Sequence, residues 1–182
     1  MLRTSDILDE KDKHLREKNI DVEFPLKEET KKLINDMLEH LYYSQIEEYS
    51  KKYDLRPGMG LAAPQLGVNQ RFFVICHEES ENKFKNYILI NPKMISHSEE
   101  LIYASEGEGC LSVNREVPGI VPRYARVTFT GYDLNGKLIK YRAREELSIA
   151  FQHEMDHLNG ILFIDHIDPK DPFKNKDYMR EI

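Results

Sequence analysis

The stretch "FQHEMDHLNG", residues 151–160, places a glutamate directly after the first of two histidines that are four residues apart. On a helix, residues four apart lie about 40° from each other around the axis, so His153 and His157 can share one metal ion. Glu154 projects about 100° from His153, near enough to reach a water molecule on that ion. The alternative is an ordinary charged helix that carries two histidines by chance.

The residues around this trio predict a helix that lies inside the protein. The spacing is helical from about residue 144 to residue 157, and Asn159-Gly160 is typical of a helix end. Because much of its circumference is apolar, the helix is expected to be wrapped by sheets. Its apolar residues are Leu147, Ile149, Ala150 and Phe151.

The rest of the chain supplies an earlier helix and several strands. Apolar residues recur at helical spacing over about residues 26–52, which predicts an N-terminal amphipathic helix. "RFFVICH" (71–77) and "NYILIN" (86–91) predict one hairpin, and "RVTFTGYDLNGKLIKYRA" (126–143) predicts another. The segment between helix and strands, "DLRPGMGLAAPQLG" (54–67), is expected to be an ordered loop. The order predicts an α+β fold, with β-sheets packed around a central metal-binding helix.

Length, composition and charge restrict the class of protein. With 182 residues, 40% of them hydrophobic and 32% charged, the chain is expected to form one domain over residues 1–182. A net charge of −6 argues against a general nucleic-acid or membrane-surface binder, although local basic patches are compatible with it. No segment approaches the roughly 18 to 20 apolar residues of a membrane span, and no signal peptide is recognised. A cytoplasmic location is therefore expected.

Two histidines need a third ligand, because a catalytic ion generally takes three protein ligands and one water. The long metalloprotease pattern H-E-x-x-H-x-x-G-x-x-H is incomplete, since Phe163 stands where its last histidine should be. Cys110 lies in the polar, glycine-rich segment "SEGEGCLSVN" (105–114), where a thiol does little for packing and is a strong candidate ligand. Cys76, flanked by "FFVI", is better interpreted as a small buried hydrophobe.

Three motifs now stand in order along the chain: "GMGLAAPQ" at 58–65, "EGCLS" at 108–112 and "HEMDH" at 153–157. Together they resemble the motifs of peptide deformylases. Enzymes of this family are metal hydrolases that remove the formyl group from the N-terminal methionine of newly made bacterial and organellar proteins. The resemblance spans the chain from the N-terminal helix to the tail, and it implies a metal-dependent enzyme that releases formate from N-formyl-methionyl nascent peptides.

The resemblance also implies a metal centre. Its ligands would be Cys110, His153 and His157, and Glu154 would be the catalytic acid and base. This donor set suits Zn²⁺, Fe²⁺, Co²⁺ or Ni²⁺. The family resemblance implies one divalent ion, Fe²⁺ in cells.

Further residues of the motifs would contact the substrate. The side-chain amide of Gln65 and the backbone N–H of Leu111 would donate hydrogen bonds to the carbonyl oxygen under attack, and Gly60 would line the groove for the substrate backbone. Asp156 is either a solvated helix residue or a hydrogen-bonding partner near the site. The histidines outside the motif, at 14, 40, 77, 97 and 166, are interpreted as surface or packing residues.

Two features of the chain outside the three motifs indicate the subclass of the family that it resembles. The chain has a longer insertion before the first motif, "HLYYSQIEEYSKKYDLRP" (40–57), and no long helical extension after the third. This resembles the second, Gram-positive-type class. A transient contact with the ribosome is compatible with the resemblance, but docking through a C-terminal helix is not expected.

Two other hypotheses fit the pentapeptide alone. An H-E-x-x-H metallopeptidase would cleave internal amides, whereas a deformylase would cleave only formyl-methionyl peptides. A non-catalytic metal-binding module would need a closed set of four protein ligands and no neighbouring base. Only three candidate ligands are visible in the sequence.

Overall fold

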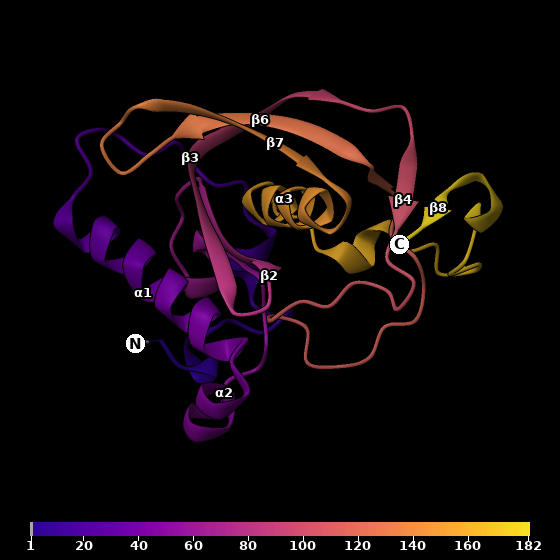
Figure 1. Ribbon diagram of the computed structural model, residues 1–182, viewed down its shortest axis with the longest axis horizontal. Helices are drawn as coiled ribbons and strands as arrows, with labels where there is room; N and C mark the ends of the chain where they lie inside the picture. Colours follow the sequence, from indigo (N-terminus) through magenta and orange to yellow (C-terminus); the bar gives the residue numbers. More distant parts are fainter. Residues whose placement is uncertain (1) are drawn as a thin grey trace.

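The computed structural model describes residues 2–182 and confirms the α+β fold, with sheets packed around a central helix (Figure 1). One antiparallel sheet has the strand order β1-β2-β3-β6-β7, and a smaller sheet has the order β5-β4-β8. The helices are α1 (Glu28–Ser44), α2 (Glu47–Tyr53) and α3 (Glu145–Leu158). The strands are β1 (Gly60–Ala62), β2 (Phe72–Ser80), β3 (Lys83–His97), β4 (Leu101–Tyr103), β5 (Arg123–Tyr124), β6 (Arg126–Tyr132), β7 (Leu138–Arg144) and β8 (Arg180–Glu181).

Strand β2 separates two hydrophobic clusters. Successive side chains of a strand point to opposite faces. Phe72, Val74 and Cys76 therefore pack in the cluster that contains α1, and Phe73 and Ile75 pack in the cluster that contains α3. Burial on both faces explains why this strand is apolar without alternation. The part of the sheet formed by β2 and β3 consequently lies between α1 and α3, whereas β6 and β7 pass over α3 (Figure 1). Cys76 is a free, buried thiol on the α1 side.

Helix α3 is buried as its sequence predicts. Phe151 is fully buried and meets Phe73 and Phe129 edge to face, with ring centroids 5.8 and 5.4 Å away. Such pairs add to the free energy gained by burying the rings. The helix ends at Leu158, whose carbonyl oxygen accepts a hydrogen bond from Arg71 at 3.0 Å. The packing fixes how α3 presents its opposite, polar face.

The N-terminal helical region differs from its prediction in extent. Residues 26–52 were expected to form one amphipathic helix, but the chain forms α1 and α2 with a break at Gln45 and Ile46. The Gln45 amide nitrogen donates to the carbonyl oxygens of Leu41, at 3.1 Å, and Cys76, at 2.9 Å. This side chain satisfies a carbonyl at the end of α1 and ties that end to β2.

Two other segments gain structure that the sequence did not predict. Part of the expected loop at 54–67 is β1, an edge strand paired with β2. The C-terminal tail, which has no clear pattern, ends in β8, parallel to β4. Across residues 2–182, none of the helices combines the length and the apolar character needed to cross a bilayer.

Candidate metal centre

The structure brings the three predicted ligands together. The candidate ligand atoms of Cys110, His153 and His157 all lie within 4.8 Å of one another. Cys110 reaches this point from the loop after β4, and both histidines project from α3. Cys110 Sγ lies 3.4 Å from His157 Nε2. Within residues 2–182, these side chains form the single group of three or more histidine, cysteine or acidic residues suited to a metal ion.

The chemical state of His157 fits a metal ligand. Burial holds the pKa of His157 well below its usual value, so the ring is neutral and keeps a lone pair for ligation. One thiolate and two imidazoles form a donor set that first-row transition metals and zinc accept. Beside them, Glu154 Oε2 is buried without a hydrogen-bond partner. A buried carboxylate oxygen without a partner, on a residue that lines the same cleft as Cys110 and His153, fits a site that binds a further polar group.

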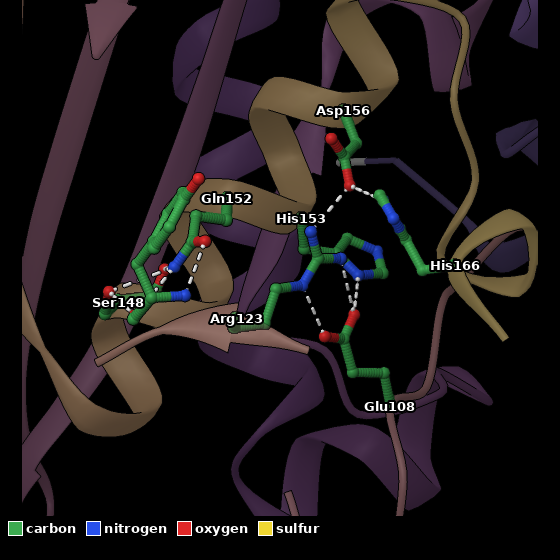
Figure 2. Close-up of polar contacts among 8 residues, drawn as sticks. Glu108, Arg123, Ser148, Gln152, His153, Asp156 and His166 are labelled. Atoms are coloured by element: carbon green, nitrogen blue, oxygen red, sulfur yellow. Dashed lines mark hydrogen bonds and ion pairs between the residues drawn. The ribbon is translucent and has the colours of Figure 1, made fainter. Parts of the chain in front are cut away.

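His153 is oriented by a buried carboxylate. Its Nδ1 atom lies 2.8 Å from Glu108 Oε2, which leaves Nε2 free for an ion. Arg123 holds Glu108 in a bidentate pair, with Nε 2.7 Å from Oε1 and Nη2 3.0 Å from Oε2. Figure 2 shows the Glu108 carboxylate facing both Arg123 and His153. Burial alone would raise the pKa of Glu108, but the Arg123 charge and the hydrogen bonds from His153 and Arg123 lower it to about 2.

Asp156 belongs to the same network from the other side of Arg123. Arg123 Nη1 donates to Asp156 Oδ2 at 2.6 Å, and His166 Nε2 lies 2.7 Å from the same oxygen. Asp156 is thus a hydrogen-bonding residue near the site, although it contacts Arg123 and His166 and not a metal-binding histidine. The interpretation of His166 as a surface or packing residue was incomplete, because it completes the Arg123 network (Figure 2).

Helix α3 is also tied to the strand that carries Arg123. The Gln152 side chain accepts a hydrogen bond from the Tyr124 backbone N–H and donates one to the Tyr124 carbonyl oxygen, both at 3.0 Å. Ser148 Oγ donates to the same carbonyl oxygen at 2.8 Å (Figure 2). These bonds set the distance between α3 and β5, and hence between His153 and the arginine that supports it.

Glycines of the first motif allow the three motifs to touch. A Cβ atom added to Gly60 would overlap the Glu154 carboxylate, and one added to Gly58 would lie 2.8 Å from Leu111 Cδ1. Only glycine permits these approaches without a shift. Burial raises the pKa of Glu154 to about 7, a value suited to a group that exchanges protons near neutral pH.

Gln65 is buried with its amide in one orientation. Its Oε1 accepts a hydrogen bond from the Ala62 backbone N–H at 2.9 Å, so the NH₂ group must face the opposite way. Nε2 donates to Ser112 Oγ at 3.1 Å and lies 3.7 Å from Cys110 Sγ. A donor that is fixed before the reaction requires no reorganisation during it. Leu111, between Cys110 and Ser112, packs its side chain into the cluster that contains α1.

A cleft adjoins the donor cluster. It has a volume of about 620 Å³, within the range of small-molecule sites. Gly60, Gln65, Cys110, His153 and Glu154 all line it. Of the residues predicted to hold the ion, exchange protons or contact substrate, all except His157 therefore line one cavity.

Three supporting residues were missed in the sequence. Arg56 donates to the carbonyl oxygens of Cys110, at 3.1 Å, and Val113, at 3.2 Å, and so holds the cysteine loop. Neither Arg56 nor Arg123 lies in a motif, and no local signal marks them. Glu108 could have been found, because metal-binding histidines usually donate their second N–H to an oxygen and this carboxylate lies inside "EGCLS".

One thiolate and two imidazoles around a point, a buried carboxylate beside them and an adjoining cleft define the class of one-metal hydrolases. The chain belongs to the polypeptide deformylase family, whose model matches residues 4–173. It is similar to a peptide deformylase of Macrococcus caseolyticus, with 50% identity over 175 residues that cover 96% of this chain and 95% of that protein. Peptide deformylase 2 of Bacillus cereus is 45% identical over 177 residues, covering 97% of this chain and 96% of that protein.

Solved structures agree with the sequence comparison. The crystal structure of peptide deformylase from Thermotoga maritima matches this fold with a TM-score of 0.70 and 33% identity, covering 90% of this chain and 97% of that chain. The mixed arrangement of helices and antiparallel sheets is therefore the fold of this family.

Proposed function

We propose that this chain removes the formyl group from the N-terminal formyl-methionine of newly made proteins, and that Cys110, His153 and His157 hold the one divalent ion this reaction needs. The observation that carries the proposal is the convergence of these three side chains within 4.8 Å beside Glu154. The family match over residues 4–173 supports the same activity. Residues 1–182 would act as one catalytic domain in the cytoplasm.

When held by Cys110, His153 and His157, the ion would supply Lewis acidity toward the formyl oxygen and would lower the pKa of a water molecule toward neutrality. Cys110 contributes a soft thiolate and the two histidines contribute imidazoles, a set compatible with Fe²⁺, Zn²⁺, Ni²⁺ or Co²⁺. We propose Fe²⁺ in cells. Elemental analysis of protein purified without oxygen, with formate release measured on the same sample, tests this assignment.

Glu154 would move the proton. Its pKa of about 7 lets the carboxylate accept a proton from water and return it to the leaving amine at neutral pH. Because Gly60 has no side chain, the carboxylate can lie against the backbone of β1. The partner-free Oε2 is the atom that we assign to this exchange.

Gln65 and Leu111 would stabilise the negative oxygen that develops during attack. The Gln65 amide is already oriented by Ala62 and Ser112, and the Leu111 backbone N–H follows the cysteine ligand directly. The substrate backbone would lie along Gly60 in β1. That strand is at the edge of its sheet, so an extended peptide can add to it through main-chain hydrogen bonds.

The proposed partners are N-formyl-methionyl nascent peptides, with a transient ribosome contact and no direct binding of nucleic acid. A ribosome contact that depends on a C-terminal helix is not part of the proposal, because the chain after α3 contains 3-10 turns and β8.

The test is formate release from a formyl-methionyl tripeptide, compared with its free-amine and internal-amide counterparts. We expect only the formylated peptide to react; cleavage of internal amides would instead support the metallopeptidase. Glu154→Gln should keep one metal ion per chain and lose almost all turnover. Glu48→Gln, an exposed site on α2, is the matched control. Substantial turnover in Glu154→Gln would remove Glu154 from its role.

A further inference from the structure

The C-terminal strand reaches the cleft of the metal centre. Ile182 lines this cleft together with Ala104 and Ile149. It also packs against the small buried cluster that contains Ile149 and Ile102. Ile149 lies about one helical turn before His153 on α3. Ile182, which packs beside Ile149, therefore borders the cleft about one turn away from this candidate metal ligand.

The floor of the cleft between these points is apolar. Ile149 and Ala150 precede His153 by four and three residues, so all three share one face of α3, and all three line the cleft. The reacting formyl carbon must lie at the ion, and the first side chain of the substrate branches two bonds further along. That side chain therefore enters the cleft beside His153. The apolar floor suits an unbranched thioether.

Hydrogen bonds on both sides fix the backbone of Ile182. Its N–H donates to the Tyr103 carbonyl oxygen at 3.0 Å, and its carbonyl oxygen accepts from the Ser105 N–H at 2.9 Å. The chain that contains Tyr103 and Ser105 continues into the loop that carries Cys110. The main chain of Ile182 is consequently held in place, and its side chain forms part of the cleft wall.

Arg180 attaches this wall to the start of α3. Its guanidinium donates to both Glu145 carboxylate oxygens, at 2.7 and 2.8 Å, and to Glu100 Oε1 at 2.8 Å. Glu145 lines the cleft, begins α3 and has a φ of 53°, a left-handed conformation that is uncommon outside glycine. Arg180 thus links β8 to the start of α3, the helix that forms the floor of the cleft.

We propose that Ile182, positioned by Arg180, closes the part of the cleft that receives the first side chain of the substrate and so limits the size of that side chain. Ile182 is then a specificity-determining residue, and Arg180 is a positioning residue that acts through it. This inference rests on the proposed deformylase function.

The test compares kcat/KM for formyl-Phe-Ala-Ser with kcat/KM for formyl-Met-Ala-Ser. In Ile182→Ala, we expect this ratio to rise by roughly 10-fold, because the removed carbons leave room for a ring. Arg180→Met should raise it by a smaller factor, about 3-fold, because the wall is present but less firmly held. Arg126→Met is the matched control, since Arg126 also pairs with Glu100 but has no hydrogen bond to Glu145.

A second variant at the same position should shift the preference toward smaller first side chains. Ile182→Phe enlarges the wall and should lower kcat/KM for formyl-Met-Ala-Ser relative to formyl-Ala-Ala-Ser by roughly 10-fold. Unchanged ratios in both Ile182 variants would overturn the inference. A wild-type protein that releases no formate from formyl-Met-Ala-Ser would instead overturn the proposed function, so the two failures can be told apart.

Discussion

Two arginines, Arg123 and Arg180, have the same bonding pattern in different surroundings. Each donates to both oxygens of one carboxylate and to one oxygen of a second. The Arg123 side chain is 3% exposed and pairs with Glu108 behind His153, whereas the Arg180 side chain is 45% exposed and pairs with Glu145, which lines the cleft. Similar ion pairs are therefore expected to have different energetic consequences in the two places.

Burial decides what each cluster can do. Removing one partner of a buried ion pair leaves an uncompensated charge in a poor solvent, which is strongly destabilising. An exposed ion pair is solvated and screened by salt, so its loss changes little. The Arg123 cluster thus holds His153 in a fixed orientation, as a metal ligand requires. The Arg180 cluster holds a wall that can adjust without unfolding the protein.

Replacing Arg123 should produce the largest effect. Arg123→Met leaves Glu108, 4% exposed, without its cation, and we expect the free energy of unfolding to fall by about 3–5 kcal/mol. Urea unfolding followed by circular dichroism, at a fixed metal concentration, measures this change. Arg180→Met is the comparison and should lose only a small fraction of that amount. Equal losses would mean that burial does not distinguish the two clusters.

A milder change in the buried cluster should weaken metal binding more than it lowers the stability of the fold, because Arg123 would still be paired with Asp156. Glu108→Gln keeps an oxygen that can accept from His153 Nδ1 but removes the charge that fixes the ring. We expect metal affinity to weaken by about 10- to 100-fold. Competition with a chromophoric chelator measures it. Glu145→Gln makes the same substitution in the exposed cluster and should leave metal affinity unchanged; a similar loss there would contradict the comparison.

The two clusters also show how far the sequence could be interpreted. The residues of α3 are local, so helical spacing was enough to predict the burial of Phe151 and the pairing of His153 with His157. Arg123 meets Glu108 and Asp156 across 15 and 33 positions of chain, and no spacing rule reports such contacts.

The other differences have the same origin. The break after α1 depends on Gln45 reaching the carbonyl oxygen of Cys76, a residue on another element. The tail gains β8 only because Ile102 and Tyr103 offer a strand beside which Arg180 and Glu181 can pair. Contacts between distant elements therefore decided both the extent of the N-terminal helix and the structure of the tail.

His166 provides a smaller test within the buried cluster. His166→Gln removes the imidazole at Asp156 Oδ2, while Arg123 remains bonded to that oxygen. Because the His166 side chain is partly exposed, we expect a loss near the low end for one hydrogen bond, about 0.5 kcal/mol. Thermal unfolding measures this loss. The control is His14→Gln, because His14 pairs with Asp12, which is distant in sequence from the metal-centre residues. A loss as large as that of Arg123→Met would mean that His166 stabilises the cluster as much as Arg123 does.

The smallest expected effect is the salt dependence of stability, which should differ between the two arginine variants. At about 1 M salt the Debye length falls to about 3 Å, so interactions of exposed charges are largely screened while buried pairs are affected much less. The small difference in unfolding midpoint between wild type and Arg180→Met should therefore disappear as sodium chloride is raised, and the difference for Arg123→Met should persist. Urea midpoints at low and high salt measure both. A persistent difference for Arg180→Met would indicate that its bonds to Glu145 stabilise the start of α3 by geometry and not by charge, since the φ of 53° at Glu145 would then depend on the bidentate contact itself.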